Sequence, residues 1–426
     1  MHAGVDNSSN DPRNCWIVKF NFRRFNMNKK ISAAVASAAL VLGATSANAG
    51  IIIPAGEWTL DVNGNVNVYA SYTTYDDTGA VPGGLAGIDD GVSDDNQTIG
   101  TGLLPAWLGF TGTTRQNDLD VSFTISMQPN VSDNGVAGDS KSNGPLWRQA
   151  FLTFGDASWG TVKMGKDLGI FAGQAILADM TLLGVGSNAA NSGQSTTLGG
   201  IGTGYIYPAW KGQISYTTPN MNGLQATIAI TNPNQHANSS VNSARQDRFG
   251  IEGQVIYSMD MGKVWVSGAS YEYTTGTAGQ DWDASALDVG ATLNFGNAGI
   301  TAYYYNGEGI GSTTFGGLTG TTATDAGHDT DYNERDSDGG YVQATYVIPT
   351  GTKLGVAYGI SNLDRAGADA TNETMLEENN RWTVGAYHPL TKHLNLVAEY
   401  NAIESKGHND TSNESETISL GAILFF

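Results

Sequence analysis

The sequence predicts an all-β fold, a transmembrane antiparallel β-barrel of sixteen strands. Three observations favour it: apolar and polar residues alternate, short turns alternate with long polar loops, and the final residues form an apolar strand. In a barrel set in lipid, every strand is paired and the outward face contacts acyl chains. A soluble β-sandwich is the alternative, but it gives no reason for the alternation of loop lengths.

Period-two alternation is the main signal for the strands. From Trp58 to Tyr72 the even positions are mostly apolar and the odd positions mostly polar, and the same alternation recurs around Phe123, Val289 and Leu396. We expect strands near 57–75, 103–114, 119–130, 146–155, 160–166, 209–218, 223–232, 248–258, 263–274, 285–295, 299–306, 340–348, 352–361, 381–388, 393–403 and 416–426.

The connections between these strands alternate in length. Short ones, such as Arg115–Asp118 and Pro219–Asn222, carry the residues of tight turns. Long ones, such as Asp76–Gly102 and Gly307–Gly339, are polar and often acidic. Bacterial barrels combine short periplasmic turns with long outer loops.

The first 49 residues are not expected to belong to the fold. Met27-Asn28-Lys29-Lys30 is basic, an Ala-rich apolar run follows, and Ala47-Asn48-Ala49 resembles a cleavage site. We therefore expect 27–49 to be a signal peptide, 1–26 to precede the true start at Met27, and 50–426 to be the barrel domain. Cys15 is the single cysteine, so the mature domain has no disulfide.

Composition excludes several classes of protein. No segment after the signal peptide approaches the ~20 consecutive apolar residues of a transmembrane helix. Lys and Arg number 21 against 41 Asp and Glu, for a formal net charge of −20. A chain this acidic repels phosphates, so nucleic acid is not an expected partner.

Several motifs resemble those of the general, non-specific porins of Gram-negative outer membranes. Arg148–Gly155 followed by Gly160–Lys166 looks like the hairpin before the third loop of that family. Tyr216–Pro219 with Gly223-Leu224 is similar to a family turn, and Phe426 resembles the terminal residue that the barrel-assembly machinery recognises.

The resemblance implies a homotrimeric, water-filled channel for passive diffusion of small hydrophilic solutes. The protein would be exported through the periplasm into the outer membrane, where lipid and lipopolysaccharide surround it. The resemblance also implies that a long third loop, about Asp167 to Pro208, folds into the lumen and narrows the lumen. The loop is longer than usual in the family, and Lys166 stands where the family often has Arg.

Charged residues at the narrowest section are expected to set ion selectivity. The candidates are Asp167 and Asp179 on the loop and five basic residues directed inward: Arg148, Lys166, Lys211, Arg248 and Arg381. Alternation supports Lys211 and Arg248, whereas Arg148 and Lys166 are assigned by resemblance. Acidic outer loops favour cations, so we expect mild cation selectivity.

Catalytic, cofactor and metal sites are not expected. The histidines are scattered and no G-x-S-x-G motif occurs. Asp329-x-Asp331-x-Asn333 begins like a calcium loop, but Glu334 occupies the position that needs glycine.

Two other functions remain open beside the general channel. A substrate-specific sugar channel would carry aromatic residues along its lumen, and inward tyrosines are expected to be few, Tyr69, Tyr75 and Tyr387 among them. A structural or adhesin barrel would have a plugged lumen.

Overall fold

The computed structural model describes residues 50–76, 79, 81–87, 94–129, 146–188, 196–232, 248–274, 280–314 and 326–426. The predicted segments 1–26 and 27–49 lie outside this part of the chain. No helix within it is long and apolar enough to cross a membrane.

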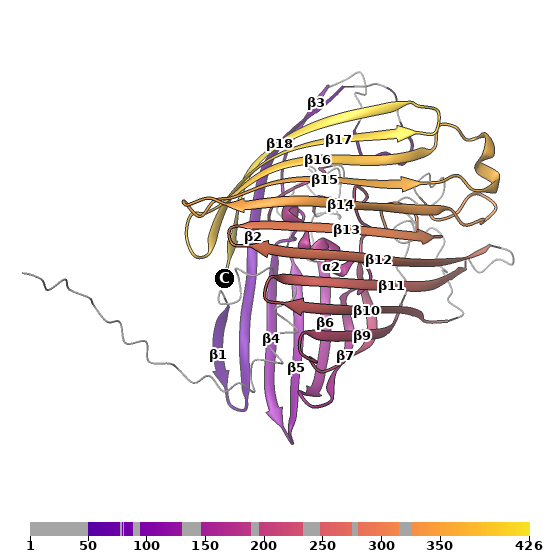
Figure 1. Ribbon diagram of the computed structural model, residues 1–426. Coiled ribbons are helices and arrows are strands. Elements are labelled where there is room, and N and C mark those ends of the chain that lie inside the picture. The colour runs from indigo at the N-terminus through magenta and orange to yellow at the C-terminus, as the bar shows by residue number, and fades with distance from the viewer. Residues whose placement is uncertain are drawn as a thin grey trace, which may run out of the picture.

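Sixteen antiparallel strands close into a barrel, as predicted (Figure 1). The ring closes where β18 pairs with β2, from Phe425 opposite Asn65 to Ser415 opposite Tyr75. In order around the ring, the strands are β2 (Trp58–Tyr75), β4 (Trp107–Gln116), β5 (Leu119–Gln128), β6 (Leu146–Asp156), β7 (Gly160–Leu168), β8 (Trp210–Thr217), β9 (Leu224–Thr231), β10 (Gly250–Met259), β11 (Gly262–Thr274), β12 (Asp281–Phe295), β13 (Ala298–Glu308), β14 (Asp336–Val347), β15 (Lys353–Leu363), β16 (Leu376–Pro389), β17 (Leu394–Gly407) and β18 (Ser412–Phe425).

Two short strands extend this ring and were not predicted. β1 (Ile51–Ala55) pairs with the first residues of β2. It lies on the same edge of β2 that pairs with β18 from Asn65 onward. β3 (Asp95–Gly100) pairs with the end of β2, on the edge that β4 occupies earlier. Five and six residues are too few for alternation to be read from the sequence.

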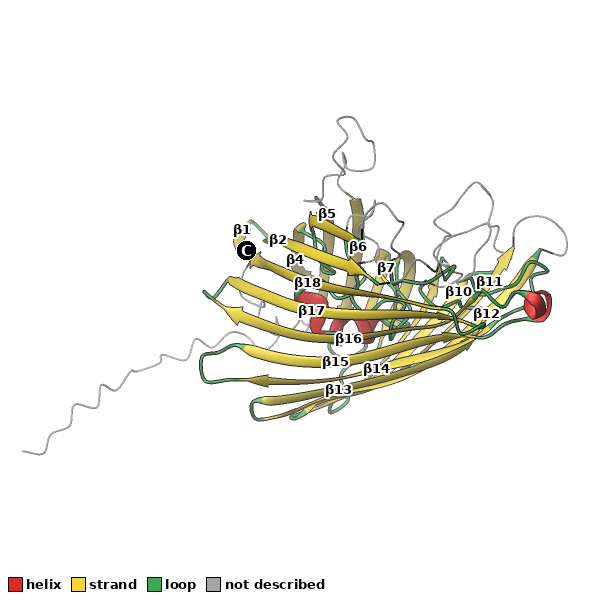
Figure 2. Cartoon of the chain, turned by 90° about the horizontal axis from the view of Figure 1, so that it is seen from above, coloured by secondary structure: helices red, strands yellow, loops and turns green. Residues whose placement is uncertain are grey.

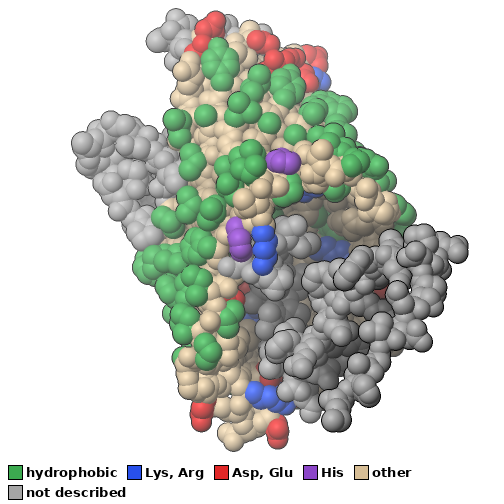
Figure 3. Space-filling model, turned by 90° about the vertical axis from the view of Figure 1, so that its left-hand side faces the viewer, with side chains coloured by type: hydrophobic (Ala, Val, Ile, Leu, Met, Phe, Trp, Pro, Cys, Tyr) green, Lys and Arg blue, Asp and Glu red, His purple; other side chains and the backbone are tan. Residues whose placement is uncertain are grey.

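The predicted lipid face is confirmed by the exposure of alternate side chains. Val66, Leu287 and Val289 are 48%, 68% and 50% exposed. Asn65 and Asp288, which lie at the alternate positions beside them, are buried. An apolar face this extensive needs an apolar surrounding, which the bilayer supplies. Figure 3 shows hydrophobic side chains over much of the strand surface and acidic ones toward its two ends.

Strand lengths differ around the barrel. β7, β8 and β9 have 9, 8 and 8 residues, whereas β12 has 15 and β16 to β18 have 14 each. The long strands continue beyond their predicted outer ends, where outward positions become polar, as at Glu378 and Glu404. The prediction stopped too early there because these ends leave the apolar band that produces the alternation.

The short turn between β4 and β5 illustrates the predicted periplasmic connections. Asn117 and Asp118 both have positive φ, at 49° and 63°. Two such residues form the type I′ turn that joins antiparallel strands with their natural twist.

Candidate functional site

The described residues of the long segment between β7 and β8, 169–188 and 196–209, lie on the inward side of the sheet. The segment contains the helix α2 (Gly173–Ala178) and the 3₁₀ helix η2 (Met180–Leu183), and Figure 2 shows these helices inside the curve of the strands. Its side chains Phe171, Ile176 and Leu182 are buried. These apolar side chains therefore pack against the rest of the protein.

Three buried carboxylates on the strands accept hydrogen bonds from the backbone of this loop. Glu252 on β10 accepts from the N–H groups of Ile170 and Phe171. Asp288 on β12 accepts from the N–H of Ala172 at 3.1 Å. Buried N–H groups need partners, so these carboxylates fix the path of the loop at its start.

Glu399 on β17 makes the corresponding contact with the later part of the loop. It accepts from the N–H groups of Val185 and Gly186, both at 2.9 Å, and from the hydroxyl of Tyr387 at 2.7 Å. Sequence reasoning missed all three carboxylates. The sequence pattern that could have identified them is an acidic residue at an inward position between outward apolar residues, as at Asp288 between Leu287 and Val289.

The inward face of β10 to β17 carries large aromatic side chains on β11 to β14 and on β16, and we call this face the aromatic wall. Its rings are at most 5% exposed, and the hydroxyl of Tyr341 donates to the carbonyl of Ala175 in α2 at 2.8 Å. Its members are Trp265, Tyr271, Tyr273, Trp282, Tyr303, Tyr305, Tyr341 and Tyr387. The expectation of few inward tyrosines was therefore an underestimate. The run Tyr303–Tyr305 hid the alternation because all three residues are alike.

The inward face of β4 to β9 differs, and we call it the hydroxyl wall. Several of its hydrogen bonds join small side chains on neighbouring strands, such as Ser122 to Thr153 at 2.5 Å and Thr217 to Thr227 at 2.9 Å. These side chains are too short to reach across the lumen.

Asp179 and Arg381 come together between the loop and β16. The carboxylate of Asp179 accepts from the N–H of Thr181 at 2.9 Å, which caps η2, and from the hydroxyl of Tyr205 at 2.8 Å. Arg381 lies 3.8 Å from it, and both side chains are 2% exposed. The pair is buried rather than directed into water.

Asp167 and Lys211 belong to two other ion pairs. Asp167 accepts from Lys163 at 2.5 Å and from the side chain of Gln149 at 3.0 Å. Lys211 donates to Glu252 at 2.6 Å and to the hydroxyl of Tyr271 at 2.9 Å, and it is buried. Each predicted charge is thus offset by a partner that sequence reasoning did not identify.

Arg148 and Lys166 lie near each other at the outer ends of β6 and β7. The pairing of β5 with β6 shifts register at Arg148, because Ser126 pairs with Gln149 and Met127 with Trp147. Such a bulge redirects the side chain of the extra residue.

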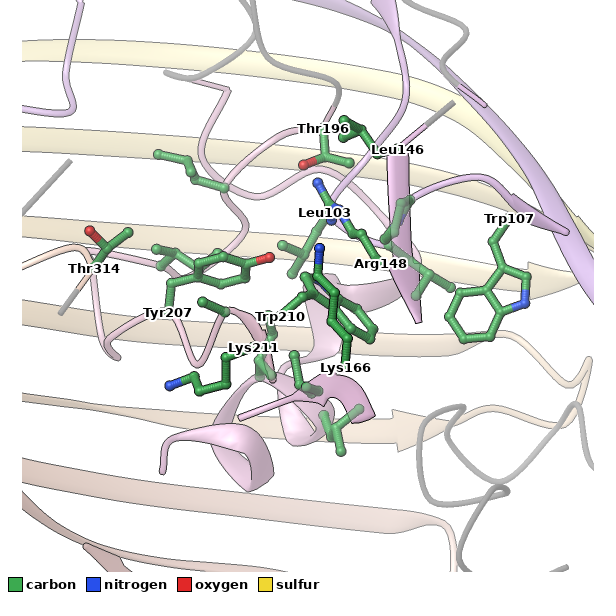
Figure 4. A pocket seen from close by; sticks show the side chains of 18 of the residues that line it. Leu103, Trp107, Leu146, Arg148, Lys166, Thr196, Tyr207, Trp210, Lys211 and Thr314 are labelled. Atoms are coloured by element: carbon green, nitrogen blue, oxygen red, sulfur yellow. The ribbon is translucent and has the colours of Figure 1, made fainter. Parts of the chain in front are cut away.

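Lys166 has the same parity as outward Met164, so alternation does not support the inward direction assigned by resemblance. Its ammonium donates to the carbonyl of Trp147 at 3.0 Å, beside the backbone of Arg148. Both side chains line one cavity near the rim (Figure 4).

Arg248 lies apart from the other candidates. It contacts Glu272 at 3.2 Å and the hydroxyl of Ser270 at 3.1 Å, and both residues have outward parity on β11. The expected inward direction does not hold, because β10 begins only at Gly250 and the alternation does not extend back to Arg248.

The Asp329 loop closes on itself instead of presenting its carboxylate to a cation. Asp329 accepts from the N–H groups of Asp331, Asn333 and Ala368 and from the side-chain amide of Asn333, at 2.7 to 2.9 Å. Within the described residues no group of three or more His, Cys, Asp or Glu could hold a metal ion. The acidic stretch Asp89–Asp95 lies largely outside those residues.

Phe426 completes the seam of the barrel. Its N–H donates to the carbonyl of Gly64 at 3.0 Å, and the N–H of Gly64 donates to its carbonyl at 2.9 Å. A side chain at Gly64 would meet the ring of Phe426, so this glycine allows the close approach.

Several solved structures resemble this chain. The outer membrane channel DcaP of Acinetobacter baumannii aligns with a TM-score of 0.65 and 18% identity, covering 89% of this chain and all of that one. The anion-selective porin from Comamonas acidovorans gives 0.60 and 16%, covering 87% and 100%. OmpT of Vibrio cholerae in its trimer form gives 0.52 and 16%, covering 87% and 99%. At these identities the likeness shows the fold alone.

The sequence itself identifies the family. No curated protein matches the chain at a significant level. The family model of Gram-negative porins matches residues 36–408, which is most of the chain. The outward apolar face and the closed ring of strands are what this family needs in the outer membrane. The chain belongs to the family of Gram-negative porins.

Proposed function

We propose that this outer-membrane porin is a channel for passive diffusion of small hydrophilic solutes and ions. The observation that carries the proposal is a loop that is anchored to the inward side of a closed barrel by Glu252, Asp288 and Glu399. We expect a loop held in this way to narrow the channel and so to set which solutes pass. Porins of this family are typically channels without enzymatic activity.

Single-channel conductance in a planar bilayer tests this proposal. We expect stable conductance steps that increase with salt concentration. A barrel with a plugged lumen, as in a structural or adhesin protein, gives no such steps. A substrate-specific channel conducts, but its current falls when its substrate is added at low concentration.

Mild cation selectivity, predicted from the sequence, stays a prediction. The acidic outer loops support it, because they raise the local concentration of cations at the mouth. Asp167 and Asp179 support it less than expected. Both carboxylates are buried, and each is paired with a basic residue, Lys163 or Arg381. The zero-current potential in a salt gradient decides the question, and a wild-type channel that prefers chloride contradicts the prediction.

The homotrimer is also part of the proposal. The trimer form of the Vibrio cholerae relative supports it only through the shared fold. An unheated gel should show a band at the mass of three chains, and a monomeric band counts against the trimer.

Export and assembly complete the proposal. The signal peptide 27–49 would direct export, and Phe426 would be read by the barrel-assembly machinery. Deletion of Phe426 should leave less barrel in the outer membrane, because it removes both the proposed signal and two hydrogen bonds at the seam. A normal yield of assembled barrel would exclude this role.

A further inference from the structure

Two lysines, Lys263 and Lys353, lie on the inward face of the barrel at its inner end, where the short turns are. Each comes just after a short turn, and each sits beside an outward, exposed apolar residue, Val264 or Leu354. Both lysine side chains are partly exposed, so solvent reaches them. Neither was among the charged residues that we expected to set ion selectivity.

Both lysines lie on the inner side of the loop between β7 and β8. The ammonium of Lys263 donates to the side-chain oxygen of Gln174 in α2 at 2.6 Å. Lys353 lies two positions before Gly355, where an added side chain would meet the sulfur of Met180 in η2. The two helices of the loop therefore stand next to these two charges.

Neither lysine forms an ion pair within the part of the chain that the structure describes. Lys263 bonds to a neutral amide and packs over the ring of Trp265 at 5.6 Å, and Lys353 packs over the ring of Tyr387 at 5.0 Å. From the short turns up to the carboxylates that anchor the loop, the inward positions of β11 to β17 hold no Asp or Glu. An amide or a ring leaves the charge of an ammonium in place, whereas a carboxylate would offset it.

The outer end of the barrel has the opposite charge. The connection Asp76–Gly102 holds six acidic residues and no basic residue, and Gly307–Gly339 holds seven acidic residues and one basic residue. Where the second connection leaves the strands, Glu308 and Asp336 are exposed and lie opposite each other on β13 and β14. The charge therefore changes sign along the barrel, from acidic at the long connections to basic at the inner ends of β11 and β15.

We propose that Lys263 and Lys353 make the inner end of this channel attract small anions, such as phosphate and acetate, while its outer mouth attracts cations. Fixed charges of one sign raise the local concentration of ions of the other sign. One voltage then drives cations and anions each into the end that favours them, and the reverse voltage depletes both. The channel therefore passes more current in one direction than in the other, a property that passive diffusion alone does not require.

Single-channel current at opposite voltages tests this inference. We score each channel by the ratio of its larger to its smaller current, so the direction of insertion does not matter. The ratio should exceed one at about 0.1 M salt and approach one at about 1 M, because screening shortens the reach of a fixed charge from about 10 Å to about 3 Å. Equal currents at about 0.1 M salt would overturn the inference.

Three variants show whether the two lysines cause the asymmetry. Lys263→Gln and Lys353→Gln should each remove about half of the excess of the ratio over one, since each lysine carries one of the two charges. Lys353→Arg retains the charge and should keep the ratio of the wild type. The matched control is Lys392→Gln, which removes an exposed lysine in the short turn between β16 and β17, at the same end but outside the strands, and should also keep that ratio.

A second measurement uses the variant in which both Lys263 and Lys353 are replaced by Gln. Its zero-current potential in a salt gradient should move toward cations, because the inner end no longer attracts anions. A current ratio and a potential equal to those of the wild type would exclude the lysines. Gel mobility before and after heating verifies that each variant is folded.

The recordings also separate this inference from the proposed function. A protein that conducts with the same ratio in the wild type and in the double variant keeps the channel and loses the inference. A protein that never conducts contradicts both.

Discussion

The aromatic wall and the hydroxyl wall belong to one sheet but differ in what their inward side chains contact. Rings and carboxylates of the aromatic wall reach the loop, for example from Tyr341 to Ala175 and from Asp288 to Ala172. Side chains of the hydroxyl wall bond to neighbouring strands. The loop is thus packed against one side of the barrel, and the cavity lies toward the outer ends of the other.

This difference shows how a barrel can hold a long loop against its inward side. A long segment inside a wide barrel must satisfy its backbone N–H groups and bury its apolar side chains. Concentrating large residues on one wall does both.

The largest expected effect comes from breaking the most buried anchor of the aromatic wall. Glu252→Gln leaves the buried charge of Lys211 without its counter-ion, which should cost about 3–5 kcal/mol. Thermal unfolding, followed as the loss of the compact band on a gel, measures the change.

Two controls show whether the lost ion pair is the cause. Lys163→Met on the hydroxyl wall breaks the pair with Asp167, in which the lysine side chain is 25% exposed, and should cost less than Glu252→Gln. Adding Lys211→Met to Glu252→Gln should recover part of the loss. If the Lys163 variant is destabilised as much as Glu252→Gln, the two walls do not differ in this way.

Arginine substitutions next test both faces of each wall. Outward Val289→Arg and Ile228→Arg should each cost about 2–4 kcal/mol near the midplane. Inward Thr227→Arg on the hydroxyl wall should be tolerated, because it points away from lipid. Inward Asp288→Arg should not be tolerated, because Asp288 is buried and holds Ala172 and Tyr303. Yield of folded barrel measures all four, and equal yields for Thr227→Arg and Asp288→Arg would remove the distinction.

A smaller effect is expected from Asp179→Asn at the edge of the aromatic wall. Asparagine still caps η2, but Arg381 loses its charged neighbour, so stability should fall by about 1–3 kcal/mol. The zero-current potential in a salt gradient should move toward anions. An unchanged potential places Asp179 outside the field that permeating ions experience.

The smallest effect concerns the outer loops above the aromatic wall. Burial alone would raise the pKa of Asp329, but the amide of Asn333 and the N–H groups of Ala368, Asn333 and Asp331 outweigh it and lower the pKa. The ionised carboxylate therefore stabilises this loop fully above its unfolded pKa of about 4, and the contribution is lost as the pH falls through the lower folded value.

Hydrogen exchange of residues 326–334, measured between about pH 5 and about pH 2, should show this loosening. Asp329→Asn should show exchange that changes less with pH after correction for the intrinsic rate. An identical pH dependence in the variant would assign the change to another group.

The sequence by itself determined the barrel and its lipid face. Val66, Leu287 and Val289 alternate with polar neighbours because each strand separates lipid from water, and this contrast is local and repeats every two residues. Tight turns such as Asn117-Asp118 are equally local. The sixteen strands of the ring follow from these short-range signals, whereas β1 and β3 do not.

Only the tertiary structure decided which charges meet and which wall the loop occupies. Asp179 reaches Arg381, and Lys211 reaches Glu252, across 202 and 41 positions of chain, distances at which alternation carries no information. Alternation also fails at Arg148, Lys166 and Arg248, since they lie at a bulge or at strand ends where the pleat no longer fixes direction. The inward contacts depend on how the closed ring folds the loop back, and that is a property of the whole barrel.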